Sequence, residues 1–140
     1  MKLLRVLCLC AALLITACSG TQKGEPYGYI NFCGYDSGIT DPALDKFSYY
    51  KIYIDKADAG RTTTGLESQK KTFEKKISVN THLLSVEKWV LNEKSGEYEK
   101  LNNVRQPKPS YYYFEVKKNS STFVNMEVKN GEAVITSVFK

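Results

Sequence analysis

The sequence predicts an all-β domain over residues 27–140, an antiparallel β-sandwich of about seven short strands. Three observations lead to this prediction. Apolar and polar residues alternate with a period of two in most segments. Turn-forming residues separate these segments at short intervals. No segment keeps the 3.6-residue apolar period of an amphipathic helix. A closed β-barrel is the alternative, because its strands alternate in the same way.

The first part of the domain contains two strands. Residues 27–34 are aromatic and β-branched and follow Pro26, which favours a strand. A loop with one helical turn comes next. Residues 47–55 alternate strictly, which is typical of a half-buried strand. One face of this strand carries Tyr50, Ile52 and Ile54. A turn is expected at residues 58–60.

The middle of the chain predicts a long hairpin. Residues 73–79 alternate, and residues 82–91 follow after a break at Asn80. Both faces of residues 82–91 carry apolar side chains, so this strand is expected to be central and covered on both faces. A polar turn leads from it to a short strand at residues 98–101.

The end of the chain predicts three more strands. Residues 110–118 begin with four consecutive aromatic residues, and residues 122–129 alternate. Asn130 and Gly131 form the strongest short hairpin signal, since a type I′ turn needs positive φ at both central residues. Residues 133–139 complete the hairpin.

The first 17 residues predict an export signal. Lys2 and Arg5 precede a short apolar run, which is too short to span a bilayer. Residues 15–18, Ile-Thr-Ala-Cys, resemble the bacterial lipobox. This resemblance implies cleavage before Cys18, a diacylglycerol on its thiol and an acyl chain on its amine. Residues 18–26 then form the lipidated cysteine and a flexible polar tether.

The expected location of the protein follows from this lipid anchor. The chain is expected in the cell envelope, held to the membrane by the lipid on Cys18, since several acyl chains on one residue make release slow. Ser19 in place of Asp favours the outer membrane by resemblance to enteric sorting. Beyond residues 1–17 the chain contains 18 of its 20 basic residues and all 15 acidic residues. This small excess does not indicate a nucleic-acid partner.

No intramolecular disulfide is expected. Cys8 and Cys10 belong to the signal and Cys18 carries lipid, so Cys33 remains alone in its strand. A small buried hydrophobe is the expected role of Cys33. A reactive thiol, or pairing with another chain, is the alternative.

Three stretches of the domain, residues 51–55, 77–86 and 126–132, resemble PEGA-type and related transthyretin-like sandwich domains of bacterial surface proteins. The shared features are a strand ending at Asp55, His82 entering a central strand, and Asn130-Gly131 in a late hairpin. The chain departs from the pattern at Asn80-Thr81, where Pro-Gly is usual, and at Lys56, where Gly is common. The resemblance implies a non-catalytic module.

No catalytic, metal or cofactor site is predicted. His82 is the single histidine, and it lacks the partners of a zinc site. Asp36, Asp41 and Asp45 lack the spacing of an EF-hand, although a calcium site is the minor alternative. The carboxylates of Glu97 and Glu99 lie in a lysine-flanked turn, which favours a solvated loop.

Tyrosine is the most suggestive feature, because all ten tyrosines lie beyond the signal. Side chains alternate across a strand, so part of the tyrosine run must face away from the core. Exposed tyrosine is common at recognition surfaces. The candidate binding face comprises Tyr49, Tyr53, Tyr111, Tyr112 and Tyr113; sheet-covering packing is the alternative role. The sequence therefore predicts a non-enzymatic, lipid-anchored binding module for a protein or glycan partner, or alternatively a lipocalin-like carrier of a small apolar ligand.

Overall fold

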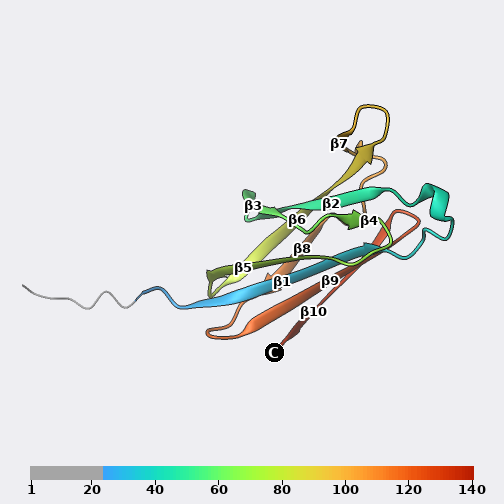
Figure 1. Cartoon of the computed structure of the whole chain (residues 1–140). Coiled ribbons are helices and arrows are strands. Elements are labelled where there is room, and N and C mark those ends of the chain that lie inside the picture. Colours follow the sequence, from blue (N-terminus) through green and yellow to red (C-terminus); the bar gives the residue numbers. More distant parts are fainter. Residues whose placement is uncertain (1–23) are drawn as a thin grey trace, which may run out of the picture.

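The computed structural model describes residues 24–140, which fold into ten strands arranged in two packed sheets (Figure 1). The strands are β1 (Tyr27–Asp36), β2 (Phe47–Ile54), β3 (Ala57–Arg61), β4 (Gly65–Leu66), β5 (Lys71–Ser78), β6 (Thr81–Asn92), β7 (Glu97–Lys100), β8 (Tyr111–Glu115), β9 (Ser121–Lys129) and β10 (Glu132–Phe139). A single 3-10 turn, η1 (Pro42–Leu44), lies between β1 and β2. The sandwich prediction is confirmed.

The four-stranded sheet has the order β10-β9-β1-β5. Its pairs β1–β5 and β9–β10 are antiparallel, but β1 and β9 run parallel. The expectation of a purely antiparallel sandwich is therefore wrong for this pair. The reason is topological: the chain traverses the whole second sheet between β1 and β9, so no hairpin dictates their relative direction.

The six-stranded sheet has the order β3-β2-β6-β7, with β4 also pairing with β2 and β8 also pairing with β6. All of its pairs are antiparallel. Strand β6 is the central strand, as predicted. Its outward side chains Leu83, Trp89 and Leu91 are only half-buried, so the expected cover on both faces is absent from the described residues.

The core lies between the sheets and is filled by aliphatic and aromatic side chains. Those less than 2% exposed include Ile30, Phe32, Tyr50, Ile52, Leu84, Val124 and Met126. Burying such side chains stabilises the fold by about 1.5–3 kcal/mol each. The closed-barrel alternative is wrong, because the described strands form two separate sheets.

One turn lies where the sequence predicts it, and another does not. Asn130 and Gly131 have φ of 53° and 82°, which confirms the predicted hairpin between β9 and β10. The turn expected at residues 58–60 instead lies at Asp55 and Lys56, with φ of 52° and 70°. Residues 57–61 form β3, and β3 and β4 are the two strands that were not predicted, whereas β7 matches the short strand expected at residues 98–101. Positive φ without glycine gives no sequence signal.

The predicted export signal, the predicted lipidation site Cys18 and most of the predicted tether lie outside the described residues. Within residues 24–140, no helix is long and apolar enough to cross a membrane.

Candidate functional site

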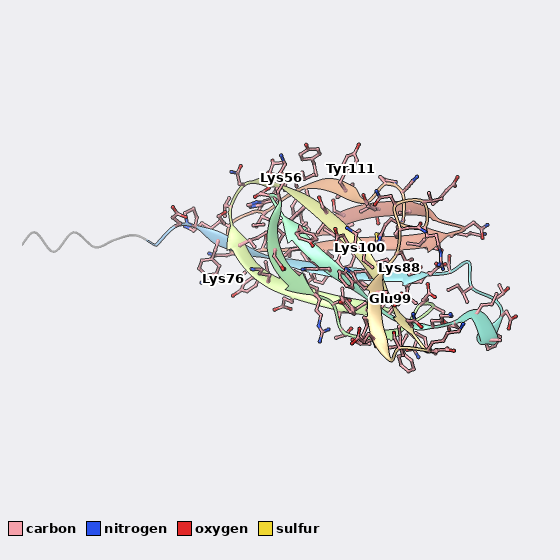
Figure 2. The ribbon with its side chains drawn as sticks, turned by 90° about the horizontal axis from the view of Figure 1, so that it is seen from above. Lys56, Lys76, Lys88, Glu99, Lys100 and Tyr111 are labelled. Atoms are coloured by element: carbon pink, nitrogen blue, oxygen red, sulfur yellow. The ribbon has the colours of Figure 1, made fainter. Side chains whose placement is uncertain are left out.

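The outer face of the six-stranded sheet gathers aromatic and charged side chains in cross-strand rows. Register places Tyr49 of β2 opposite Trp89 of β6, and Trp89 opposite Lys100 of β7. Figure 2 looks onto this sheet and labels Lys100 on it. Neighbouring strands lie about 4.8 Å apart, so side chains in one row contact each other directly.

An aromatic cluster forms around Tyr49. The ring of Trp89 is nearly parallel to that of Tyr49, with centroids 6.0 Å apart and an interplanar angle of 10°. The Tyr98 ring lies 5.1 Å from Tyr49. The Arg61 guanidinium lies over the Tyr49 ring, 5.0 Å from its centroid, which is within the range of a cation–π contact. Tyr49 is therefore only 9% exposed and has little rotamer freedom left to lose on binding.

A groove of about 270 Å³ opens beside this cluster. It is lined by Tyr49, Lys51, Asp58, Gly60, Arg61 and Trp89. Gly60 has φ of +127°, a conformation that other residues rarely adopt, so the wall of the groove at this position is bare backbone. A concave aromatic floor with charged side chains at the rim is the usual form of a recognition site.

Paired charges adjoin the cluster on the same face. Glu87 accepts hydrogen bonds from the Tyr53 hydroxyl at 3.0 Å and from Lys100 Nζ at 2.5 Å. Partial burial raises the pKa of Glu87, but these donors outweigh burial and hold its pKa below the ordinary value. Lys51 and Asp58 form an exposed pair at 3.1 Å. These partners fix the carboxylates in their ionised form around the groove.

The structure separates the five predicted tyrosines. Tyr49 and Tyr53 lie on the outer face just described. Tyr111 and Tyr113 of β8 share that face at the far side of β6 and are 58% and 64% exposed. Tyr112 points to the opposite side, packs against the core, and its hydroxyl lies 3.1 Å from that of Ser137.

Tyr111 and Tyr113 do not join the aromatic cluster. Ser85 lies between Tyr53 and Tyr111 in one cross-strand row. In Figure 2 Tyr111 lies toward one margin of the sheet, away from Lys100 and Glu99. The outer face therefore carries two separate aromatic areas, and the groove belongs to the one around Tyr49.

The other residues considered for chemistry have structural partners. His82 is 6% exposed; its Nδ1 lies 2.6 Å from Asp55 and its Nε2 lies 2.9 Å from the Ser78 carbonyl. Asp41 caps η1, and Asp45 accepts from Ser68. No group of three or more His, Cys, Asp or Glu side chains within residues 24–140 could hold a metal ion.

Sequence reasoning missed the partners that make the groove. Trp89 was visible as the single tryptophan. Tyr98 belongs to the short strand predicted at residues 98–101, and Arg61 begins a Thr-rich segment that is expected to be a loop or a weak edge strand. Only the register of β3, β2, β6 and β7 brings them beside Tyr49. Even the correct turn at Asp55 would not have revealed the contact, because a register shift between Ile52 and Tyr53 is needed to pair Arg61 with Lys51.

Comparison with known proteins gives little. No family model matches the sequence, and no curated protein matches it. Among solved structures, a candidate cell adhesion protein from Bacteroides uniformis superposes with a TM-score of 0.28 and 8% identity. The match covers 82% of this chain and 50% of that one, so this chain spans about half of its length. A similarity this low supports no inference about function.

Proposed function

We propose that the protein is a lipid-anchored module of the bacterial envelope that binds a protein or glycan partner through the groove and aromatic cluster of its six-stranded sheet, without catalysing a reaction. The export signal and lipobox support the location. The observation that supports the binding role is the Tyr49 cluster, in which two further aromatic rings and a guanidinium surround one largely buried ring.

The composition of this cluster favours a protein partner. Trp, Tyr and Arg are the residues most enriched among those that dominate binding energy at protein interfaces. They are effective when they are held rigidly, because binding then costs little side-chain entropy. Trp89 and Arg61 meet that condition because each packs against the ring of Tyr49. The charged rim of Lys51 and Asp58, with Glu87 opposite Lys51 on the next strand, would then select the partner.

The experiment is cross-linking in intact cells, followed by solubilisation, affinity capture of the full chain and mass spectrometry. Trp89→Ala and Arg61→Ala should each reduce partner recovery, and the affinity for the identified partner should fall about 30-fold for Trp89→Ala, as expected of a residue worth about 2 kcal/mol. Tyr27→Ala is the matched control, because Tyr27 is an aromatic residue 37% exposed on the other sheet. It should leave recovery unchanged.

Two results would overturn the proposed face. Equal recovery from wild type and both variants would show that the partner binds elsewhere. Loss of recovery with Tyr27→Ala alone would move the site to the four-stranded sheet. Recovery of envelope polysaccharide instead of protein, lost on Trp89→Ala, would retain the face and identify the partner as a glycan.

A further inference from the structure

One lysine and two carboxylates meet between the sheets, at the end where β1, β4 and β6 converge. Lys88 Nζ lies 3.2 Å from Asp36 Oδ2 and also contacts the Glu67 carboxylate. The side chains of Lys88 and Asp36 are 4% and 12% exposed, and that of Glu67 is 13% exposed. Lys88 is labelled in Figure 2. Because β1 belongs to one sheet and β6 to the other, the contact between Lys88 and Asp36 crosses the sandwich.

Hydrogen bonds hold both groups in place. Asp36 Oδ1 accepts from the Gly38 N–H at 2.9 Å, which turns Oδ2 toward Lys88. The Gln106 side chain makes two hydrogen bonds to the backbone of Lys88. Its Oε1 accepts from the Lys88 N–H at 2.7 Å, and its Nε2 donates to the Lys88 carbonyl at 3.1 Å. The Asp36 N–H donates to the Glu67 carbonyl at 2.9 Å. The three side chains therefore have a preorganised arrangement.

A buried aromatic side chain adjoins these groups. Tyr50 is fully buried, and its ring makes an edge contact with Phe32 at 6.0 Å. Burial, and then the negative charges of Asp36 and Glu67, raise the pKa of Tyr50, so its phenol lies within electrostatic range of both carboxylates. Because the three side chains are 4%, 12% and 13% exposed, they contact one another more than they contact solvent.

We propose that Lys88 and Asp36 become joined by an intramolecular amide bond that ties the two sheets together, with Glu67 as the proton carrier. Glu67 takes a proton from the Lys88 ammonium and passes it to the Asp36 carboxylate. The neutral amine then attacks Cγ of the neutral acid. The new C–N bond forms, a C–O bond breaks, and the oxygen leaves as water with two protons from the original ammonium. Glu67 ends in the state in which it began.

The positions of the two side chains favour the reaction. Reacting groups held at contact distance react as if at very high concentration, with effective molarities of about 10⁵ M or more in well-oriented cases. The product water has an exit, because an open pocket of about 410 Å³ is lined by Asp36, Glu67 and Lys88. The reaction needs no oxidant, metal or cofactor.

The same molecule contains a matched control. Lys51 Nζ lies 3.1 Å from Asp58 Oδ2, nearly the same separation, but these side chains are 33% and 57% exposed. Water solvates both charges there, and Lys51 has one carboxylate partner rather than two. Contact distance alone would cross-link both pairs, whereas the proposed mechanism selects Lys88.

The test is a peptide map of the purified, folded full chain by mass spectrometry. We expect a branched peptide containing Lys88 and Asp36, lighter than the sum of its two parts by one water, about 18 Da, whereas Lys51 and Asp58 are recovered unlinked. Lys88→Arg keeps the positive charge but removes the nucleophilic amine, so it should abolish the branched peptide. Glu67→Gln should slow its formation by about 100-fold, the usual contribution of a positioned proton carrier.

The wild-type map alone can overturn the proposal, even if a variant fails to fold. Recovery of the Lys88 and Asp36 peptides only as separate, full-mass species would show that the cluster is an ion pair and nothing more. A branched peptide of undiminished yield in Glu67→Gln would retain the bond and exclude Glu67 as the proton carrier. Neither result depends on whether the aromatic cluster binds a partner.

Discussion

Two lysine–aspartate pairs of this protein have almost the same geometry and opposite surroundings. Lys88 and Asp36 are 3.2 Å apart with side chains 4% and 12% exposed, whereas Lys51 and Asp58 are 3.1 Å apart with side chains 33% and 57% exposed. The comparison teaches that the distance between two charges does not determine their energetic role. Water solvates and screens the exposed pair, so its loss costs little, whereas the buried charges depend on each other entirely.

The largest expected effect comes from breaking the buried cluster. Lys88→Met leaves Asp36 and Glu67, with side chains 12% and 13% exposed, with neither an ion pair nor an amide bond to residue 88, so the free energy of unfolding should fall by about 3–5 kcal/mol. Urea titration of wild type and variant measures this loss. A change as small as that of an exposed pair would mean that water reaches the cluster and that the contrast drawn above is wrong.

Lys71 tests whether neutral acceptors can replace a carboxylate around a buried ammonium. It is 0% exposed, and its Nζ donates to the carbonyls of Leu66, Glu67 and Gln69 at 2.7, 3.0 and 2.8 Å. Lys71→Met leaves these carbonyls without their donor, which should cost about 1–3 kcal/mol. A stabilised variant would show that burial of the charge outweighs its three hydrogen bonds.

The contribution of buried Lys71 to stability should depend on pH. Burial lowers its pKa from 10.5 to about 8. Between these values the unfolded chain binds a proton that the folded chain does not, so the Lys71 contribution to stability should rise from about pH 8 to about pH 10.5 and be constant below pH 8. The difference in unfolding free energy between wild type and Lys71→Met, measured at pH 7, 9 and 10, isolates this contribution. A flat difference would contradict the lowered pKa.

A mixed pair, with one buried and one exposed partner, should have a smaller effect. Asp55 is exposed but accepts from the Leu83 N–H at 2.9 Å and contacts buried His82, and these two partners lower its pKa below 3.8. Its contribution to stability is therefore present above about pH 4 and is lost as the pH falls below that value. Asp55→Asn should reduce the difference between the unfolding free energies measured at pH 5 and at pH 3. Parallel acid-denaturation curves for wild type and variant would count against this role.

The exposed pair should matter least. Hydrogen bonding to Asp58 raises the pKa of Lys51, and the same hydrogen bond lowers that of Asp58, yet water screens both groups. Lys51→Met should leave the urea midpoint unchanged within error, and added salt should not alter the comparison. A midpoint shift as large as that of Lys88→Met would remove the contrast between the two pairs.

The strands and turns with local signals were predictable. Period-two alternation found β2, β5, β6 and β9, and Asn130-Gly131 located the last hairpin. Strand β3 was missed because its turn uses Asp55 and Lys56 at positive φ without a glycine. The parallel pairing of β1 with β9 was missed because a distant strand pair leaves no trace in local alternation.

The candidate site was only half visible. Alternation predicted that part of the Tyr111–Tyr113 run faces outward, but it did not say which members. The structure shows that Tyr111 and Tyr113 are exposed and that Tyr112 packs inward against the core. It also gave no reason to place Tyr98 and Arg61 beside Tyr49 from alternation alone, since cross-strand register sets those contacts.

By itself the sequence determined the β-rich class of the domain and the alternation that places Tyr50 and Ile52 in the core, because side-chain direction in a strand depends only on position along the chain. It also carries the expected address in residues 1–18. Only the tertiary structure decided that Lys88, an apparently ordinary lysine, lies inside the sandwich with Asp36 and Glu67. The reason is that burial and charge pairing across 52 residues of chain depend on how the two sheets meet, which no local pattern encodes.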